Sequence, residues 1–262
     1  MFALLLIFAM QTDSAALFAD SLYQFWRTQW VWQGDTSLVE FDSLVGWKSK
    51  SNLDTVFSQK WLFSTRVRTD RYGWRYNSRQ GLKNVVIIGD SFTFGWGVED
   101  NETFASLVGV RANISCPGWN SWQQLAALKR WCQTHDTTGT VFILMWNQTD
   151  QAENEYWKRL PTFDTKEQFY EFEQQFSDMR IDRLTLWERV SFLFKNWYPS
   201  ILHREDPRKT FKKRYGGIVV TIPTWTELPS GTLTFEDYYR FDGHLRPSGH
   251  RKVAEMIERA IR

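Results

Sequence analysis

Short apolar runs along the chain predict the strands of a buried sheet. Residues 85–88 (Val-Val-Ile-Ile) and 140–146 (Thr-Val-Phe-Ile-Leu-Met-Trp) are too short for typical helices and too apolar for half-exposed strands. Such runs favour central strands of a parallel sheet, which is buried on both faces. Residues 112–115 and 217–222 are predicted to be further strands.

Helical patterns alternate with these strands. Residues 102–108 can form a short helix, and Asn120 can cap a helix that runs to about residue 134. Residues 247–261 are predicted to form the last helix, with Pro247 in its first turn. Strands that alternate with helices indicate a doubly wound parallel sheet, so we predict an α/β fold.

Two segments lack this alternation. Residues 1 to about 80 carry aromatic side chains without a sustained period, which favours a lead-in that packs on a main domain at residues 81–262. From about residue 150 to 214 the sequence is polar, aromatic and helical in spacing, which predicts a helical insertion. Its basic end, residues 204–214, fits an anionic polymer or phospholipid surface or, more simply, a solvated loop.

Composition narrows the class of protein. A chain of 262 residues can bury one sizeable core, and we expect one catalytic domain. The 32 Lys and Arg residues balance 30 Asp and Glu residues, so charge gives no reason to expect a nucleic-acid partner. Core filling is the simplest interpretation of the 15 Trp residues, and a membrane-interface belt or a sugar-stacking platform are the alternatives.

The N-terminus and the cysteines say little about the compartment. The first ten residues form an apolar run shorter than the roughly 20 residues of a membrane-spanning helix, with no Lys or Arg before it. This run is compatible with export or membrane anchoring, and equally with a short buried or interfacial helix. Cys116 and Cys132 flank a predicted helix whose ends lie about 20 Å apart, too far for a disulfide. Their spacing does not predict a metal site.

Three positions with useful chemistry follow predicted strands. Ser91 follows the strand at 85–88, Asn147 follows the strand at 140–146, and Gly118 lies in the turn after residue 115. The carboxyl ends of parallel strands converge on the functional crevice of such a sheet. A serine supplies an oxygen nucleophile, and a glycine N–H and a side-chain amide can hold the oxyanion that forms on an attacked carbonyl. These are the parts of an acyl-transfer site.

A serine hydroxyl needs a base, and His244 is the best placed of the four histidines. It lies just ahead of the last helix, and the nearby Asp242 can orient its ring. We expect Asp90 to shape the loop by accepting hydrogen bonds. The remaining histidines, which we expect to be structural or solvent-facing, are His135, His203 and His250.

Four blocks of the sequence resemble the conserved blocks of bacterial SGNH (GDSL-like) hydrolases. In family order they are Gly89-Asp90-Ser91-Phe92-Thr93-Phe94-Gly95-Trp96-Gly97-Val98, Cys116-Pro117-Gly118-Trp119, Trp146-Asn147-Gln148 and Asp242-Gly243-His244. Upstream, the extended lead-in of some bacterial members is similar to Leu44-Val45-Gly46-Trp47 and Tyr72-Gly73-Trp74-Arg75.

The resemblance implies a three-layer α/β/α, flavodoxin-like fold and hydrolysis of a small-molecule or glycan ester through an acyl-enzyme. It implies Ser91 as nucleophile and His244 as base, oriented by Asp242. The oxyanion hole would comprise the Ser91 N–H, the Gly118 N–H and the Asn147 side chain. No metal or organic cofactor would be needed.

Two departures from the family pattern keep alternatives open. Only Gly243 separates Asp242 from His244, where many members have two residues. This shorter form resembles polysaccharide O-acetyltransferases, so transfer of an acetyl group to a sugar hydroxyl is an alternative. Gln148 replaces the usual Asp of the third block, which removes a carboxylate that could support the Asn147 loop. A non-catalytic carbohydrate-binding relic is the remaining alternative.

Overall fold

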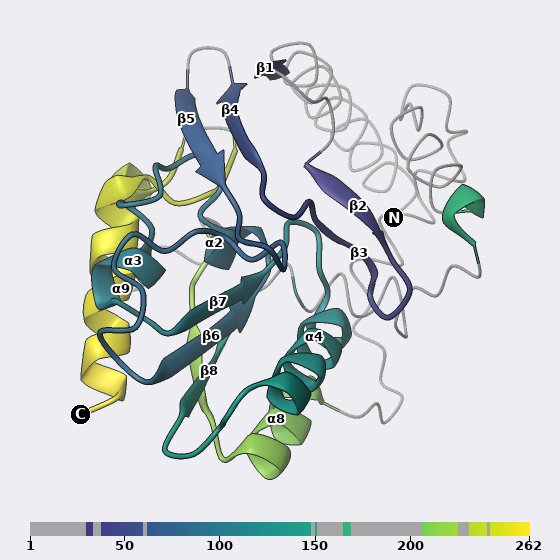
Figure 1. The fold of residues 1–262 in the computed structure, drawn as a ribbon. Helices are drawn as coiled ribbons and strands as arrows, with labels where there is room; N and C mark the ends of the chain where they lie inside the picture. Colours follow the sequence, from purple (N-terminus) through teal and green to yellow (C-terminus); the bar gives the residue numbers. More distant parts are fainter. Residues whose placement is uncertain are drawn as a thin grey trace, which may run out of the picture.

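The computed structural model of the chain describes residues 30–33, 38–59, 62–147, 150, 165–168, 206–224, 231–239 and 242–262 (Figure 1). The apolar N-terminal run and most of the predicted insertion lie outside these residues, as do His203 and Gln148. In the described part of the chain, no helix has both the length and the apolar character needed to cross a membrane.

A parallel four-stranded sheet forms the centre of the fold. Its strands are β6 (Val85–Gly89), β7 (Ala112–Ser115), β8 (Val141–Trp146) and β9 (Ile218–Thr221), in the spatial order β7-β6-β8-β9. All three neighbouring pairs are parallel, and every residue of β6 is buried. The predicted strands and the doubly wound sheet are therefore confirmed. After β6 the chain adds β7 on one side and β8 on the other, so a crevice is expected beyond the carboxyl end of β6.

Helices cover both faces of this sheet, because alternate side chains of each strand point to opposite faces. On one face lie α4 (Ser121–Thr134) and α8 (Pro207–Tyr215). On the other lie α3 (Phe104–Val108) and α9 (Pro247–Ala260) (Figure 1). The helices α2 (Ser91–Phe94) and η3 (Phe235–Asp237), the latter a 3-10 helix, are short. The expected three-layer α/β/α arrangement is present.

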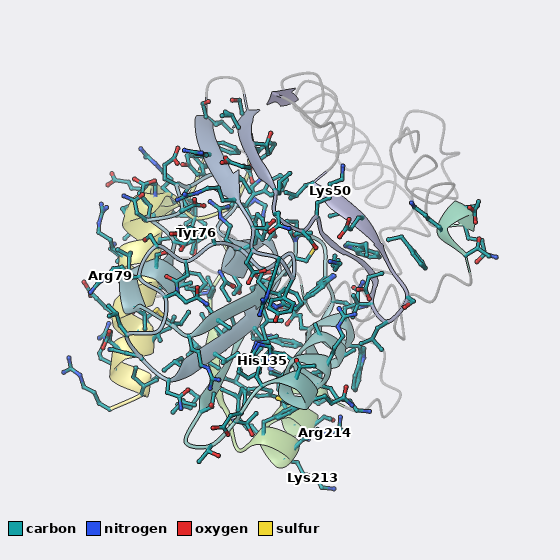
Figure 2. All side chains as sticks on the ribbon, in the orientation of Figure 1. Lys50, Tyr76, Arg79, His135, Lys213 and Arg214 are labelled. Atoms are coloured by element: carbon teal, nitrogen blue, oxygen red, sulfur yellow. The ribbon has the colours of Figure 1, made fainter. Side chains whose placement is uncertain are left out.

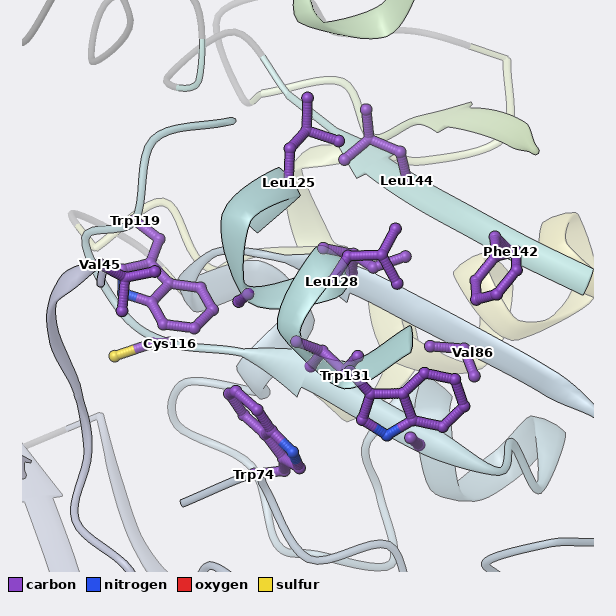
Figure 3. Close-up of a cluster of buried hydrophobic side chains, with 14 of the residues drawn as sticks. Val45, Trp74, Val86, Cys116, Trp119, Leu125, Leu128, Trp131, Phe142 and Leu144 are labelled. Atoms are coloured by element: carbon purple, nitrogen blue, oxygen red, sulfur yellow. The ribbon is translucent and has the colours of Figure 1, made fainter. Parts of the chain in front are cut away.

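Each face has its own apolar core. Under α4, Leu125, Leu128 and Trp131 pack against Val86 and Leu144 of the sheet (Figure 3). The core under α3 and α9 includes Val85, Ile87, Ile143, Met145, Phe104, Val253 and Ile257. Strands buried on both faces explain why the runs at 85–88 and 140–146 are continuously apolar.

Local signals define the helix ends as the sequence predicts. The Asn120 side chain accepts a hydrogen bond from the Gln123 N–H, and the Gln123 side chain accepts one from the Asn120 N–H. This reciprocal pair is a capping box, which satisfies two backbone donors at the start of α4. Pro247 begins α9.

The described part of the lead-in forms antiparallel strands, which the sequence analysis did not predict. The strands β1 (Trp30–Gln33), β4 (Asp54–Gln59) and β5 (Phe63–Arg68) form a three-stranded sheet in the order β1-β4-β5. A two-stranded hairpin consists of β2 (Val39–Asp42) and β3 (Gly46–Ser49). From the three-stranded sheet, Phe57 and Val67 pack against Phe94 of α2. The lead-in therefore packs directly on the helix that begins with Ser91.

The basic stretch before β9 is a helix, so its interpretation as a solvated loop is wrong. The Asp206 side chain caps α8, Pro207 occupies its first turn, and the fully buried Phe211 anchors it to the sheet core. Lys213 and Arg214 are exposed on the outer side of this helix (Figure 2). Cys116 and Cys132, at opposite ends of the β7 to α4 region, are both free, as predicted.

His250 is a structural histidine on the buried side of α9. Its ring is 1% exposed, and its Nδ1 atom accepts a hydrogen bond of 3.2 Å from the Phe104 N–H at the start of α3. Burial, helped by the positive charge of Arg75, lowers the pKa of His250 to about 3. The ring is therefore neutral in the folded protein at neutral pH.

We expect this histidine to make the free energy of unfolding fall as the pH drops from about 6.5 toward 3. In that range the unfolded chain binds a proton that the folded chain does not, so His250 contributes a slope of about 1.4 kcal/mol per pH unit. Urea unfolding of the wild type and of His250→Asn between pH 4 and 7 measures the difference. The Asn amide can still accept the Phe104 N–H, and the variant should lack this part of the slope. Equal slopes would contradict the assignment.

Candidate active site

Ser91, His244 and Asp242 meet beyond the carboxyl end of β6. Ser91 is the first residue of α2, and His244 lies in the turn before α9. The His244 Nε2 atom is 2.8 Å from the Ser91 Oγ atom, and its Nδ1 atom is hydrogen-bonded to Asp242 Oδ1. The sequence-predicted nucleophile, base and orienting acid are thus brought together in one hydrogen-bonded chain.

Backbone hydrogen bonds to Tyr239 fix the Asp242–His244 pair. The Tyr239 N–H donates to the His244 carbonyl at 2.8 Å, and the Gly243 N–H donates to the Tyr239 carbonyl at 3.1 Å. Gly243 has a φ of +77°, a conformation that favours glycine and lets a single residue separate the acid from the base. Because the Nδ1–H group donates its hydrogen bond to Asp242, Nε2 is left as the acceptor that faces Ser91.

The His244 ring is mostly buried, but part of it is exposed to solvent. Its side chain is 20% exposed, whereas that of Asp242 is 3% exposed. The rings of Phe92 and Trp96 lie 5.0 and 5.7 Å from the imidazole, centroid to centroid. Water and a small substrate can therefore reach one edge of the base, while its acid is shielded.

Asp90 and Asn147 form the second part of the site. Asp90 Oδ1 accepts a hydrogen bond from the Phe92 N–H at 3.0 Å, and Asp90 Oδ2 accepts one from Asn147 Nδ2 at 2.9 Å. Both residues are 1% exposed. Asp90 accepts loop hydrogen bonds as predicted, and it connects the Ser91 turn to Asn147. Burial raises the pKa of the Asp90 carboxyl.

Gly118 lies at the same edge of the sheet, in a tight turn after β7. Pro117 and Gly118, whose φ is +76°, occupy the central positions of a type II turn closed by the Trp119 N–H and the Cys116 carbonyl, 3.3 Å apart. From the lead-in, Trp47 Nε1 donates to the Pro117 carbonyl at 3.3 Å. The turn lies beside Trp47, and the place of the Gly118 N–H in an oxyanion hole stays a prediction.

Asp150 is a site residue that the sequence analysis missed. Its Oδ2 atom accepts a hydrogen bond of 2.8 Å from the Asn147 N–H, and its side chain is fully buried. Gln148 stands where the family usually has Asp, which predicts the loss of a carboxylate that could support Asn147. The carboxylate of Asp150 contacts Asn147 instead. Burial and the neighbouring charge of Asp90 raise the pKa of Asp150 well above its ordinary value. An Asp three residues after Asn147 matches the spacing of a capping box, which is the signal that could have revealed it.

Arg75 is a second missed residue, within the Tyr72–Arg75 block. Its side chain is 0% exposed, and its Nε atom lies 2.9 Å from Asp100 Oδ1. Its guanidinium also donates to the carbonyls of Gly95 and Val98, at 3.4 and 2.9 Å. Arg75 therefore holds the loop at residues 95–100, which directly follows the helix of Ser91.

The remaining clusters lie away from this site. A cavity of about 120 Å³ is lined by residues that include Tyr72, Arg111, Trp131 and His135, near the C-terminal end of α4, and no triad residue lines it. Within the described residues, no group of three or more His, Cys, Asp or Glu side chains is placed to share a metal ion.

Comparisons with known proteins give a distant likeness to solved structures. No family model matches the chain, and no curated protein matches it. Among solved structures, it is similar to a "putative lipolytic protein of G-D-S-L family" from Desulfitobacterium hafniense DCB-2, with 16% sequence identity and a TM-score of 0.35. The match covers 67% of this chain and 98% of that one.

Proposed function

We propose that this protein is a serine-dependent ester hydrolase that acts through an acyl-enzyme. The observation that carries the proposal is the chain from Ser91 Oγ through the His244 ring to Asp242, with 2.8 Å between Oγ and Nε2. That distance lets the imidazole take the hydroxyl proton directly, and a buried carboxylate on the other ring nitrogen stabilises the imidazolium that forms.

In the first half of the reaction, the Ser91 oxygen attacks the ester carbonyl carbon while His244 Nε2 takes the hydroxyl proton. The carbonyl π electrons move to the carbonyl oxygen, which becomes an oxyanion. When this intermediate collapses, the bond to the alcohol oxygen breaks, and the proton on Nε2 passes to the departing alcohol. The acyl group is then bound to Ser91.

In the second half of the reaction, water attacks the acyl-enzyme in the same way. His244 takes a proton from water as its oxygen attacks the acyl carbon, and the proton returns to Ser91 Oγ when the acid leaves. A sugar hydroxyl in place of water gives acyl transfer, so the same groups support either outcome and the acceptor decides between them.

We assign the oxyanion to the Ser91 N–H, the Gly118 N–H and the Asn147 side-chain amide. The Asn147 amide donates from Nδ2 to Asp90 Oδ2, which places it beside the residue that precedes Ser91, and we assign this amide to the oxyanion. Donors of this kind act where charge develops in the transition state, and each is worth about 100-fold to 1,000-fold in rate. A small-molecule or glycan ester is the substrate class that this chemistry requires.

Labelling with a fluorophosphonate tests the nucleophile, because this reagent forms a stable bond only with an activated serine. We expect intact-mass analysis to show one adduct, and peptide mapping to place it on Ser91. As the fraction of labelled protein rises, hydrolysis of p-nitrophenyl acetate should fall by the same fraction. A folded sample that neither labels nor turns over the ester would reject catalysis and favour a binding role, whereas acetyl groups on an added polysaccharide would identify a transferase.

A further inference from the structure

We propose that Asp150 is a positioning residue that orients Asn147 and couples it to the Gly118 turn. This inference rests on the proposed function, because it gives Asn147 and Gly118 the task of holding the oxyanion. It adds the residue that fixes their geometry.

Two hydrogen bonds clamp Asn147 to Asp150. Asn147 comes directly after β8, where the ladder to β9 ends with the pair Trp146 and Thr221. Its backbone N–H is 2.8 Å from Asp150 Oδ2, and the Asp150 N–H is 3.4 Å from Asn147 Oδ1. The reciprocal pattern is that of a capping box, with Asn147 and Asp150 as its two members.

The clamp determines which way the Asn147 amide faces. Its oxygen meets a backbone donor, the Asp150 N–H, and its nitrogen meets an acceptor, Asp90 Oδ2. A rotation of the amide by 180° would oppose donor to donor and acceptor to acceptor, so one orientation is selected. In that orientation Nδ2 lies on the side of Asp90, the residue that precedes Ser91.

A second branch of the network reaches the Gly118 turn. Gln124 Nε2 donates to Asp150 Oδ1 at 2.6 Å and to the Trp119 carbonyl at 3.1 Å. Trp119 is the last residue of the turn that contains Gly118. Asp150 therefore holds Asn147 through Oδ2 and, by way of Gln124, the Gly118 turn through Oδ1.

The burial of Asp150 distinguishes this arrangement from an ordinary helix cap. A cap carboxylate usually lies at the surface, whereas Asp150 is 0% exposed and receives its hydrogen bonds from neutral groups on Asn147, Gln124 and Ser121. Burying a carboxyl in this way costs stability. Its negatively charged neighbour Asp90 adds to that cost, as the raised pKa of Asp150 indicates. A residue that lowers stability while it aligns two predicted oxyanion donors fits a role in the reaction.

Steady-state kinetics of Asp150→Asn on p-nitrophenyl acetate test the proposal. The Asn side chain keeps the size but replaces one acceptor oxygen by a donor, so the bonds from Asn147 and Gln124 cannot both remain. We expect kcat to fall about 10-fold to 100-fold with KM changed less than about threefold, because an oxyanion donor acts mainly in the transition state. In Asn147→Ala, kcat should fall further, by about 100-fold to 1,000-fold.

The double variant separates positioning from general damage. If Asp150 acts through Asn147, adding Asp150→Asn to Asn147→Ala should lower kcat by less than about threefold more. Asp42→Asn is the control for the loss of a buried carboxylate elsewhere, because Asp42 is buried, accepts backbone hydrogen bonds from Leu44 and Val45, and pairs with Arg130. This control should lower the melting temperature and leave kcat unchanged.

Three results would overturn the proposal: unchanged kcat in Asp150→Asn, multiplicative effects in the double variant, or an equal loss of kcat in Asp42→Asn. If Asp150→Asn does not fold, Gln124→Leu removes the 2.6 Å hydrogen bond from Gln124 to Asp150 Oδ1 and leaves the longer one from Ser121, and it should lower kcat with little change in KM. A Gln124→Leu protein with unchanged kcat would then reject the network. Failure of the proposed function itself would appear differently, as no labelling and no turnover in the wild type.

Discussion

Ser91→Ala and His244→Ala are each expected to lower kcat for p-nitrophenyl acetate by about 10,000-fold or more, and the double variant should be no slower than either single one. Without the base the hydroxyl stays protonated, and without the hydroxyl the base has no proton to take, so the two groups act as a unit. The 2.8 Å contact between Ser91 Oγ and His244 Nε2 is the structural reason to expect this.

Turnover of the four proteins, together with loss of fluorophosphonate labelling in both single variants, measures the effect. The control is His135→Gln, because His135 stacks on Trp131 with 4.4 Å between ring centroids and lies apart from the triad. It should keep wild-type kcat. Losses that multiply in the double variant would mean that Ser91 and His244 act independently, which the mechanism does not allow.

The central sheet was predictable because its strands are defined by burial on both faces. The run at 85–88 is apolar at every position, and all of β6 is buried. Asn120 was predictable as the cap of α4 because its side chain and that of Gln123 satisfy backbone donors three residues apart. In both cases the signal lies within a few consecutive residues.

The lead-in strands were not predictable in the same way. In β5, buried Thr65 and Val67 alternate with Ser64, Arg66 and other less buried residues, so the buried face is only partly apolar. In the pairing with β4, Val56 lies opposite Arg66. Whether such a residue favours a strand depends on its neighbours in the adjacent strand, which the local sequence does not show. The pattern of hydrophobic residues therefore does not predict these strands. Residues 207–215 were misjudged for a related reason, because only Pro207 and Phe211 are buried in a helix that is otherwise strongly basic.

The site residues also differ in whether a local sequence pattern could predict them. Ser91 and Asn147 were found because each follows an apolar strand, and His244 because it precedes the last helix with Asp242 beside it. Arg75 was missed as a functional residue because its partner Asp100 is 25 residues further along the chain. Nothing in the sequence around a single arginine indicates burial, and only the folded chain shows what the side chain holds.

Arg75→Met is expected to lower the free energy of unfolding by about 3–5 kcal/mol, the usual cost of removing one member of a buried ion pair. The Asp100 side chain is 6% exposed, so loss of Arg75 leaves a buried carboxylate with reduced compensation. The Val98 carbonyl also loses its Arg75 donor at 2.9 Å, whereas the Gly95 carbonyl keeps the hydrogen bond from the Val98 N–H. Each unsatisfied buried acceptor adds to the destabilisation.

Arg68→Met is the matched control, because Arg68 contacts the same carboxylate at 2.5 Å but is 36% exposed. An exposed partner is screened by solvent, so this variant should lose about 1 kcal/mol or less. Urea unfolding with a common m-value measures both changes. Equal losses would mean that Asp100, and not the Arg75 network, sets the stability of the loop. A larger loss for Arg75→Met, with reduced kcat at temperatures where the variant is folded, would show that the lead-in holds the Trp96 loop in place beside His244.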